Sequence, residues 1–203
     1  MVELQLLTGM RPGEVRNMRT CDLDTGGRVW IYKPHVHKTQ HHQTDRLVYL
    51  GPRAQQILGS FLRTETTAYL FSPRDAVDER NRERRVHRIS PMTPSQRRRR
   101  PKANPKRPPR AHYDKNSYAR AIKRACDLAD ENARKSKKTS NDGGRIVPRW
   151  SPNQLRHNAA TRFRKEYGLE VAQIMLGHRS AEVTQIYAER DEERALSVVA
   201  KIG

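Results

Sequence analysis

The sequence predicts an α+β domain that is mostly helical and holds a small antiparallel β-sheet. Apolar residues recur at the three- and four-residue spacing of amphipathic helices over several segments, above all in the C-terminal half. Two short segments, 28–33 and 45–50, are rich instead in β-branched and aromatic residues and predict strands. A length of 203 residues fits one domain that carries an insertion better than two independent domains.

The chain begins with two predicted helices. A leucine-rich helix stops at Thr8-Gly9, and Pro12 opens a second helix that runs to about Met18. Because the chain opens inside what reads as an ongoing helix, we expect residues 1–203 to be an N-terminally truncated fragment of a longer protein.

A hairpin and a helix follow. The segments 28–33 and 45–50 are expected to pair as two strands of a long hairpin, which ends at Gly51-Pro52. The next helix is predicted from Arg53 to Thr64, with one apolar side formed by Ile57, Leu58, Phe61 and Leu62. Residues 68–71 predict a third short strand.

The C-terminal part is expected to be helical throughout. One amphipathic helix follows Asn116-Ser117, with Tyr118, Ile122, Cys126 and Ala129 on its apolar side, and a polar loop follows at 135–145. Ser151-Pro152-Asn153-Gln154 has the pattern of a capping box with proline at the first helical position. The helix that begins there should bury Leu155, Ala159 and Phe163. Three short helices are predicted after it: one with Val171, Ile174 and Met175 that ends at Gly177, one from Ser180 to Tyr187, and one over 192–200.

The charge of the chain favours a polyanionic partner. Lys+Arg 41 against Asp+Glu 22 gives a formal net charge of +19, and such a charge points to nucleic acid because each neutralised phosphate releases condensed counterions. No apolar run approaches the roughly 18 residues of a spanning helix, and the N-terminus lacks the pattern of a secretory signal. The two cysteines, Cys21 and Cys126, have no zinc-binding spacing and indicate a reducing, intracellular location.

Much of the charge excess lies in residues 73–115, which we interpret as a flexible basic insertion. Between Ser90 and His112 there is no acidic residue, and six prolines make a helix or a central strand improbable. We expect its basic residues to contact DNA. The alternatives are a solvated loop without a dedicated partner or a localisation signal. The candidate DNA-binding residues are Arg97, Arg98, Arg99, Arg100, Lys102, Lys106, Arg107 and Arg110.

A few residues in other segments could carry chemistry. Arg11 and Glu14 are three apart at a helix start, so the carboxylate can orient the guanidinium. Asn153 and Arg156 are likewise three apart in the capped helix. His178 follows the glycine that ends a helix, and Tyr187 comes nine residues later. Each alone reads as a surface arginine, a loop histidine or a half-buried aromatic residue. Together they predict a phosphodiester site, since guanidinium groups bind phosphate oxygens in pairs and a phenol can attack phosphorus.

The order of these residues resembles the tyrosine recombinase (phage integrase) family, in its catalytic domain. Thr8-Gly-Met-Arg-Pro-Gly-Glu14 is similar to the first arginine box of the family, and Leu155-Arg-His-Asn-Ala-Ala-Thr161 is similar to the second. Leu176-Gly-His-Arg-Ser180 and Thr184-Gln-Ile-Tyr187 resemble its histidine and nucleophile boxes. The insertion is longer and more basic than is usual in the family.

The resemblance implies a role for each box residue. Arg11, supported by Glu14, and Arg156 would clamp the scissile phosphate and stabilise the charge of the transition state. His178 would donate a further hydrogen bond to the phosphate. Tyr187 would attack in line, forming a 3′-phosphotyrosyl bond and releasing a 5′-hydroxyl. No cofactor, ATP or metal is expected.

In this family a lysine of the β-hairpin protonates the leaving oxygen. Lys38, in His37-Lys38-Thr39, is the best match, and Lys33 is the competitor because hairpin registers are uncertain from sequence.

One position departs from the family pattern. Asn153 stands where the family usually has histidine, three residues before the second arginine. Asparagine can hydrogen-bond a phosphate but cannot shuttle a proton, so activity could be reduced or the proton could pass to another group or to water. His157 is expected to point about 100° away from Arg156 on the helix and to be structural.

The function expected from these observations is site-specific cleavage and rejoining of double-stranded DNA by an integrase of a phage or mobile element. The resemblance implies a tetrameric synapse on DNA, assembled through the C-terminal segment, and a cytoplasmic, nucleoid-associated location with no membrane partner. The alternatives are a catalytically degenerate DNA-binding protein and a type IB topoisomerase. A metal site formed by His35, His37, His41 and His42 is a further alternative, although histidines of a hairpin next to DNA are the simpler explanation.

Overall fold

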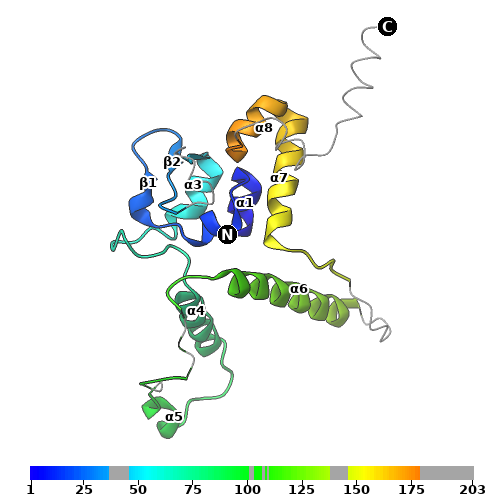
Figure 1. Ribbon diagram of the computed structural model, residues 1–203. Helices are drawn as coiled ribbons and strands as arrows, with labels where there is room; N and C mark the ends of the chain where they lie inside the picture. The colour runs from blue at the N-terminus through cyan, green and yellow to red at the C-terminus, as the bar shows by residue number, and fades with distance from the viewer. Residues whose placement is uncertain (37–45, 101–102, 107, 109, 138–145, 179–203) are drawn as a thin grey trace.

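The computed structural model describes residues 1–36, 46–100, 103–106, 108, 110–137 and 146–178 (Figure 1). Around α1 (Val2–Thr8) lie a three-stranded sheet, α3 (Pro52–Gly59), α7 (Pro152–Tyr167) and α8 (Leu169–Leu176). The longest helix, α6 (Lys115–Lys137), runs below this group. The mostly helical α+β class with a small antiparallel sheet is therefore confirmed.

The turn between the first two helices is built around Gly9. The glycine has φ of +65° and closes α1 through a hydrogen bond from its N–H to Gln5 O. A Cβ atom at this position would lie 2.7 Å from Leu176 Cδ2, so the absence of a side chain allows α1 to approach α8 closely. Pro12 then opens α2 (Pro12–Arg16), which ends earlier than the sequence predicts. The predicted stop at Thr8-Gly9 and the start at Pro12 are confirmed.

The sheet has the order β1 (Leu23–Asp24), β2 (Trp30–Tyr32), β3 (Val48–Leu50), and all its pairs are antiparallel. The predicted pairing of the two β-rich segments is confirmed, with Ile31 opposite Tyr49. The predicted third strand at 68–71 is wrong. There Tyr69 makes only an isolated bridge with Arg19, and the third strand of the sheet is β1. The apolar residues at 70–71 are buried because this segment packs on the chain after α2, where Leu70 N–H donates to Met18 O.

The predicted length of the helix after the sheet is also wrong. It ends at Gly59, and the N–H groups of Phe61 and Leu62 both donate to Leu58 O in a closing turn. Both side chains are consequently exposed, at 42% and 39% of their surface, and only Ala54 and Leu58 of α3 are buried.

The C-terminal helices pack mainly as the periodicity predicts. Tyr118, Ile122 and Cys126 place α6 in the same apolar core as α1 and the sheet. The capping box at Ser151 and the proline at the first turn of α7 are present. In α8, however, the buried residues are Ala172 and Leu176, whereas Val171 and Ile174 are 41% and 57% exposed. This short helix packs on α7 through Ala172 and Leu176, so Val171 and Ile174 face outward.

The insertion contains two helices where the sequence predicts none. α4 (Pro73–Val86) begins with Ser72 as its cap, and α5 (Pro94–Arg98) begins with a capping box formed by Thr93 and Gln96. Pro73 and Pro94 each stand in the first helical turn, where proline lacks no needed donor, so these prolines start helices instead of breaking them. Neither helix has a buried residue.

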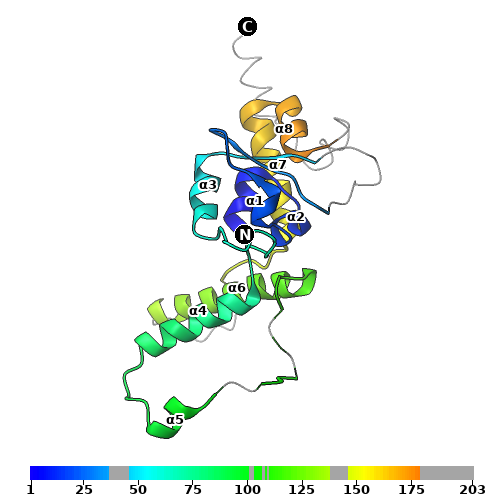
Figure 2. The same cartoon turned by 90° about the vertical axis from the view of Figure 1, so that its left-hand side faces the viewer.

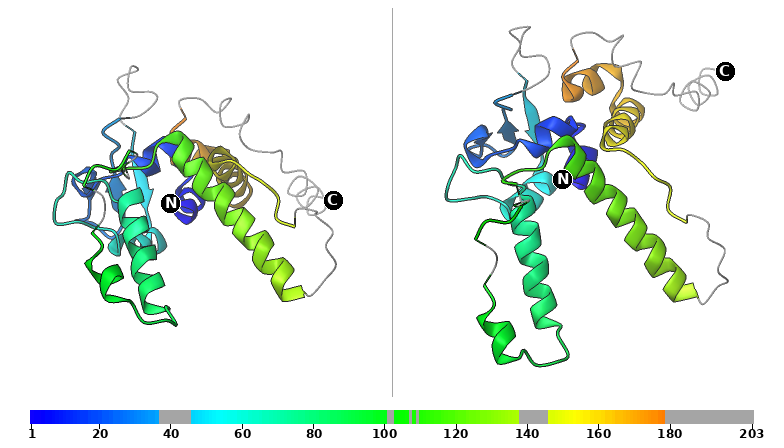
Figure 3. Two further views of the ribbon diagram at one scale, coloured as in Figure 1. Left: turned by 90° about the horizontal axis from the view of Figure 1, so that it is seen from below. Right: turned by 60° about the horizontal axis from the view of Figure 1, so that its bottom comes forward.

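The insertion leads away from the remainder of the domain. Figures 2 and 3 show that α4 and α6 extend away from α1, the sheet and α7, with α5 at the far end of α4. The predicted polar loop at 135–145 begins later than expected, because α6 continues to Lys137.

Within the part of the chain that the structure describes, no helix has the length and apolar character needed to cross a membrane.

Candidate active site

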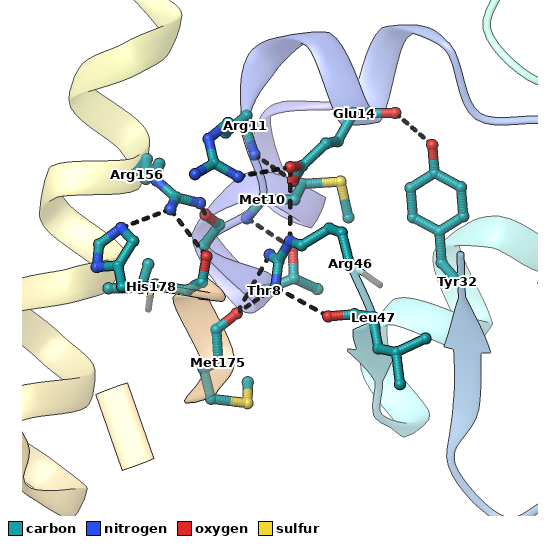
Figure 4. A network of polar contacts seen from close by, with 12 residues as sticks. Thr8, Met10, Arg11, Glu14, Tyr32, Arg46, Leu47, Arg156, Met175 and His178 are labelled. Carbon is teal, nitrogen blue, oxygen red and sulfur yellow. Dashed lines mark hydrogen bonds and ion pairs between the residues drawn. The ribbon is translucent and has the colours of Figure 1, made fainter. Parts of the chain in front are cut away.

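Arg11 and Glu14 hold each other at the start of α2. Arg11 is the capping residue of the helix, with an extended backbone, and the two carboxylate oxygens of Glu14 bind it twice (Figure 4). Oε2 accepts from Arg11 N at 2.8 Å and Oε1 accepts from Arg11 Nη1 at 2.9 Å. Glu14 is 2% exposed and the Arg11 side chain 21%. The carboxylate thus fixes a guanidinium whose remaining donors are within reach of solvent.

Arg156 lies at the point where three separate segments meet. Its side chain is 1% exposed, although it belongs to a helix with an exposed opposite face. Nη1 donates to Gly9 O at 2.6 Å, and Nη2 donates to Leu176 O at 2.8 Å. The same Nη2 lies 2.7 Å from His178 Nε2. One side chain of α7 therefore joins the turn before Arg11 to the end of α8.

His178 is held by the turn that ends α8. Gly177 has φ of +63°, and His178 N–H donates to Gln173 O at 3.1 Å. Because Arg156 has only donors, Nε2 of His178 accepts, and the neutral ring carries its proton on Nδ1. Burial of the ring, together with the charge of Arg156, lowers the pKa of His178 to about 4. The imidazole is therefore neutral at pH 7 and carries its N–H group on Nδ1.

A third arginine, Arg46, completes the network. It is 4% exposed and its Nε lies 3.5 Å from Glu14 Oε1. Burial acts to raise the pKa of Glu14, but the charges of Arg46 and Arg11 and the hydrogen bond from Arg11 N outweigh burial and lower the pKa below its ordinary value. Glu14 is thus a buried carboxylate that stays ionised between two cations.

Sequence reasoning missed Arg46, although a signal was present. Arg46, Val48 and Leu50 alternate along the chain and so share one side of the segment that becomes β3. Val48 and Leu50 are buried. An arginine on the buried side of a strand requires an acidic or carbonyl partner, and that requirement could have directed attention to Glu14.

Three buried polar side chains, Tyr32, Gln5 and Tyr118, support the network. Tyr32 OH, on β2, donates to Glu14 O at 2.8 Å. Gln5 is fully buried, and its Nε2 lies 3.2 Å from Met10 O and 3.4 Å from Pro152 O. Tyr118 OH on α6 donates to Gln5 Oε1 at 2.7 Å. The segments that carry Arg11 and Arg156 are therefore tied to the same buried amide.

The other predicted site residues are placed as follows. Asn153 is exposed, and its Nδ2 lies 3.3 Å from His157 Nε2, so His157 contacts the asparagine that replaces the usual histidine. Lys33 lies just after β2, where its N–H donates to Asp22 O. Lys38 and Tyr187 lie outside the described residues, and the assignment of the hairpin lysine and of the nucleophile stays a prediction.

The predicted DNA-binding residues that the structure describes are exposed and lie outside the arginine and histidine cluster. Arg97 and Arg98 end α5, at the opposite end of the structure from α8 (Figures 1 and 2). Arg110 pairs with Asp114 near the start of α6. The exposed members are Arg97, Arg98, Arg99, Arg100, Lys106 and Arg110, and Lys102 and Arg107 lie outside the described residues.

Of the four predicted hairpin histidines, His35 alone lies within the described residues. Its Nδ1 lies 3.1 Å from Asp22 Oδ2, and Asp22 in turn accepts from Arg19. Among the described residues no group of three or more His, Cys, Asp or Glu side chains could hold a metal ion. His37, His41 and His42 lie outside them, so the metal alternative is not tested.

Comparisons with known proteins identify the family and the fold of the chain. Residues 1–194 match the phage integrase family. Among curated proteins none matches the chain. Three solved structures share the fold: XerH recombinase bound to a palindromic difH substrate (17% identity, TM-score 0.51), XerA recombinase (18%, 0.51) and the Tn1549 transposon integrase with circular intermediate DNA (14%, 0.58).

The matches cover nearly all of this chain and part of each neighbour. They extend over 98%, 98% and 100% of the chain, in the same order, and over 43%, 60% and 57% of the solved chains. The family match spans the segments that carry Arg11, Arg156, His178 and Tyr187. The chain belongs to the phage integrase family, the tyrosine recombinases.

Proposed function

We propose that this chain is the catalytic domain of a recombinase that cleaves and rejoins double-stranded DNA through a 3′-phosphotyrosyl intermediate. The observation that carries the proposal is the convergence of Arg11, Arg156 and His178, which come from the α1–α2 turn, α7 and the end of α8 (Figure 4). Three donors from three segments form a preorganised site for a phosphate, because the fold positions them before any substrate arrives. The DNA-bound recombinases among the structural neighbours favour DNA as the source of that phosphate.

Each residue has a role in the proposed reaction. Arg11 and Arg156 bind the non-bridging oxygens, and His178 donates from Nδ1 to one of them. The phenol oxygen of Tyr187 forms a bond to phosphorus while the bond from phosphorus to the 5′-oxygen breaks. The 5′-oxygen takes a proton from Lys38, and the phenol proton passes to water. Rejoining is the reverse, so the phosphodiester energy is conserved and no ATP is needed.

The proposal extends to the assembly on DNA. We assign the exposed arginines at 97–100 a role in holding DNA phosphates away from the cleavage site. Recombination joins two duplexes, so several copies must act together, and we propose a tetrameric synapse assembled through the C-terminal segment. Such a substrate places the protein on the nucleoid.

The test uses a pool of duplexes that carry a nick and a random sequence around it. Cleavage next to the nick releases a short fragment, so the covalent adduct accumulates and can be measured on a denaturing gel. We expect an adduct whose DNA identifies the site and which Tyr187→Phe abolishes, because phenylalanine lacks the attacking oxygen. An adduct that survives Tyr187→Phe would contradict the assigned nucleophile.

The second candidate is a degenerate integrase that binds DNA without cutting it. Asn153 motivates it, since an amide cannot take up a proton at the position where the family usually has histidine. Asn153→His is expected to raise the rate of adduct formation at least about tenfold. A positioned acid or base usually contributes about 100- to 10,000-fold. Absence of adduct from both the native chain and Asn153→His, with DNA binding intact, would favour this candidate. Relaxation of supercoiled plasmid without site preference would instead favour a topoisomerase.

A further inference from the structure

Arg46 contacts two of the segments that carry the proposed phosphate ligands. Its Nη1 and Nη2 both lie 3.3 Å from Met175 O, three residues before His178, and Nη1 also donates to Leu47 O at 2.8 Å. Its Nε lies 3.5 Å from Glu14 Oε1 without forming a hydrogen bond. Arg46 itself precedes β3, so one buried guanidinium joins the sheet to the Arg11 box and to the end of α8 (Figure 4).

Glu14 needs a second cation if Arg11 binds a phosphate. The carboxylate is 2% exposed and is shared between Arg11, whose side chain is 21% exposed, and Arg46, at 3%. When Arg11 turns its donors to a substrate, part of its charge is neutralised by the phosphate. A buried carboxylate left without a counter-charge is strongly unfavourable. We expect Arg46 to stay beside Glu14 in either state, because its buried guanidinium is held by Leu47 O and Met175 O.

The turn that delivers His178 is built on Arg46. A Cβ atom at Gly177 would lie 2.4 Å from Arg46 Nη1 and 2.9 Å from Cζ, so the guanidinium fills the space beneath the glycine. Glycine is therefore favoured at position 177 for two reasons. Its φ is +63°, which side chains disfavour, and Arg46 occupies the space that a side chain would take. Displacement of Arg46 would remove the support for the backbone just before His178.

We propose that Arg46 is a positioning residue of the phosphate site, which acts through Glu14 on Arg11 and through the Met175 carbonyl on His178. It contacts no reacting atom in this assignment. The inference rests on the proposed function only for the identity of the final substrate, because a preorganised anion site can be measured with inorganic phosphate alone.

The experiment compares Arg46→Met and Arg46→Lys with the native chain and with the control Arg53→Met. Arg53 also pairs with a glutamate, Glu3, at 2.9 Å, but both side chains are largely exposed. Inorganic phosphate is titrated into protein labelled with 15N-histidine, and the imidazole signals of His178, assigned with His178→Asn, report binding. DNA affinity and the rate of adduct formation are measured on the duplex recovered from the nicked pool.

For Arg46→Met we expect phosphate affinity and adduct rate to fall about 10- to 100-fold, by analogy with the loss of an outer-shell partner of a metal site. DNA affinity should change little, since most phosphate contacts lie elsewhere. The pKa of His178 should rise from about 4 toward its ordinary value, because the ring loses a nearby charge and part of its burial. Arg46→Lys should recover part of the phosphate affinity through its charge, and Arg53→Met should behave as the native chain.

Native phosphate affinity, His178 signals and adduct rate in a folded Arg46→Met would overturn the inference. If Arg46→Met does not fold, Gly177→Ala provides the second variant, since its methyl group displaces Arg46 without removing the charge. Gly177→Ala with an unchanged phosphate titration would also contradict the assignment. Failure to obtain an adduct from any DNA would refute the proposed function and leave the phosphate measurement to decide the role of Arg46.

Discussion

His178 shows how burial and a charged neighbour together set the protonation state of a residue. Its Nε2 accepts from Arg156, a permanent cation, and the ring is 8% exposed. A second positive charge on the ring would face Arg156 at 2.7 Å, so the neutral form is favoured. In the proposed reaction the imidazole therefore acts as a neutral hydrogen-bond donor and does not contribute a positive charge at neutral pH.

The lowered pKa of His178 makes stability depend on pH in a defined direction. The unfolded chain takes up the proton near pH 6.5 and the folded chain near pH 4, so the unfolded state binds more protons between these values. We expect the contribution of His178 to the free energy of unfolding to fall as the pH drops from about 6.5 to about 4. Below about pH 4 this contribution should change no further.

Urea unfolding of the native chain and of His178→Gln across this range measures the effect. Glutamine can still accept from Arg156 but does not titrate. The difference in unfolding free energy between the two proteins should narrow or reverse toward pH 4. A difference that stays constant with pH would show that His178 is protonated in the folded chain as readily as in the unfolded one.

At the scale of the elements, the close approach of α1 to α7 and α8 depends on Gly9. A Cβ atom there would lie 2.7 Å from Leu176 Cδ2 and 3.2 Å from Phe163 Cε2, and the residue has a positive φ. We expect Gly9→Ala to destabilise the protein by about 2–4 kcal/mol, from the left-handed backbone and from overpacking together.

Gly59→Ala is the matched control for this substitution. Gly59 ends α3 and has no positive φ, and in the described structure nothing lies within 4 Å of the place that an added methyl group would take. Alanine there should be neutral or stabilising by up to about 1 kcal/mol. Thermal or urea unfolding of both variants checks the pair, and equal effects would mean that the α1–α8 contact does not depend on the glycine.

Several elements could be predicted because their signals are local. Gly9 and Gly177 end helices, and Pro12 and Pro152 begin them, at the positions that the sequence predicts. The ends that were predicted wrongly depend on packing. Phe61 and Leu62 continue the apolar pattern of α3, but a turn closes on Leu58 O before them. Helical spacing cannot distinguish a continued helix from a turn that follows it.

At the scale of the whole molecule, much of the positive charge behind the net charge of +19 lies in residues 73–115, apart from the site. The candidate DNA-binding arginines at 97–100 lie in and just after α5, at the opposite end of the structure from α8 (Figure 1), whereas Arg11, Arg46 and Arg156 lie together in the site (Figure 4). The three site arginines are held by a carboxylate and by backbone carbonyls. In the proposed function we therefore assign the exposed arginines around α5 to DNA binding, and the three site arginines to the phosphate site.

Deletion of residues 94–110 should weaken DNA binding and flatten its salt dependence. Each lost phosphate contact removes about 0.9 from the slope of the logarithm of the binding constant against the logarithm of the salt concentration. Replacement of the four arginines at 97–100 by glutamine keeps the length of the segment and should give a smaller change in the same direction. Anisotropy titrations at several salt concentrations measure both, and slopes equal to that of the native chain would refute the phosphate-contact role.

The sequence by itself determined the family, the order of the four boxes and the helix starts and stops marked by proline and glycine, because these depend on residue identity and local spacing. Only the tertiary structure decided that Arg156 uses its donors on Gly9 O and Leu176 O, and that Arg46 stands beside Glu14 beneath Gly177. These contacts join residues up to 147 positions apart, and their partners are often backbone carbonyls, which every residue has. Such partners leave no trace in residue identity, so only the path of the folded chain reveals them.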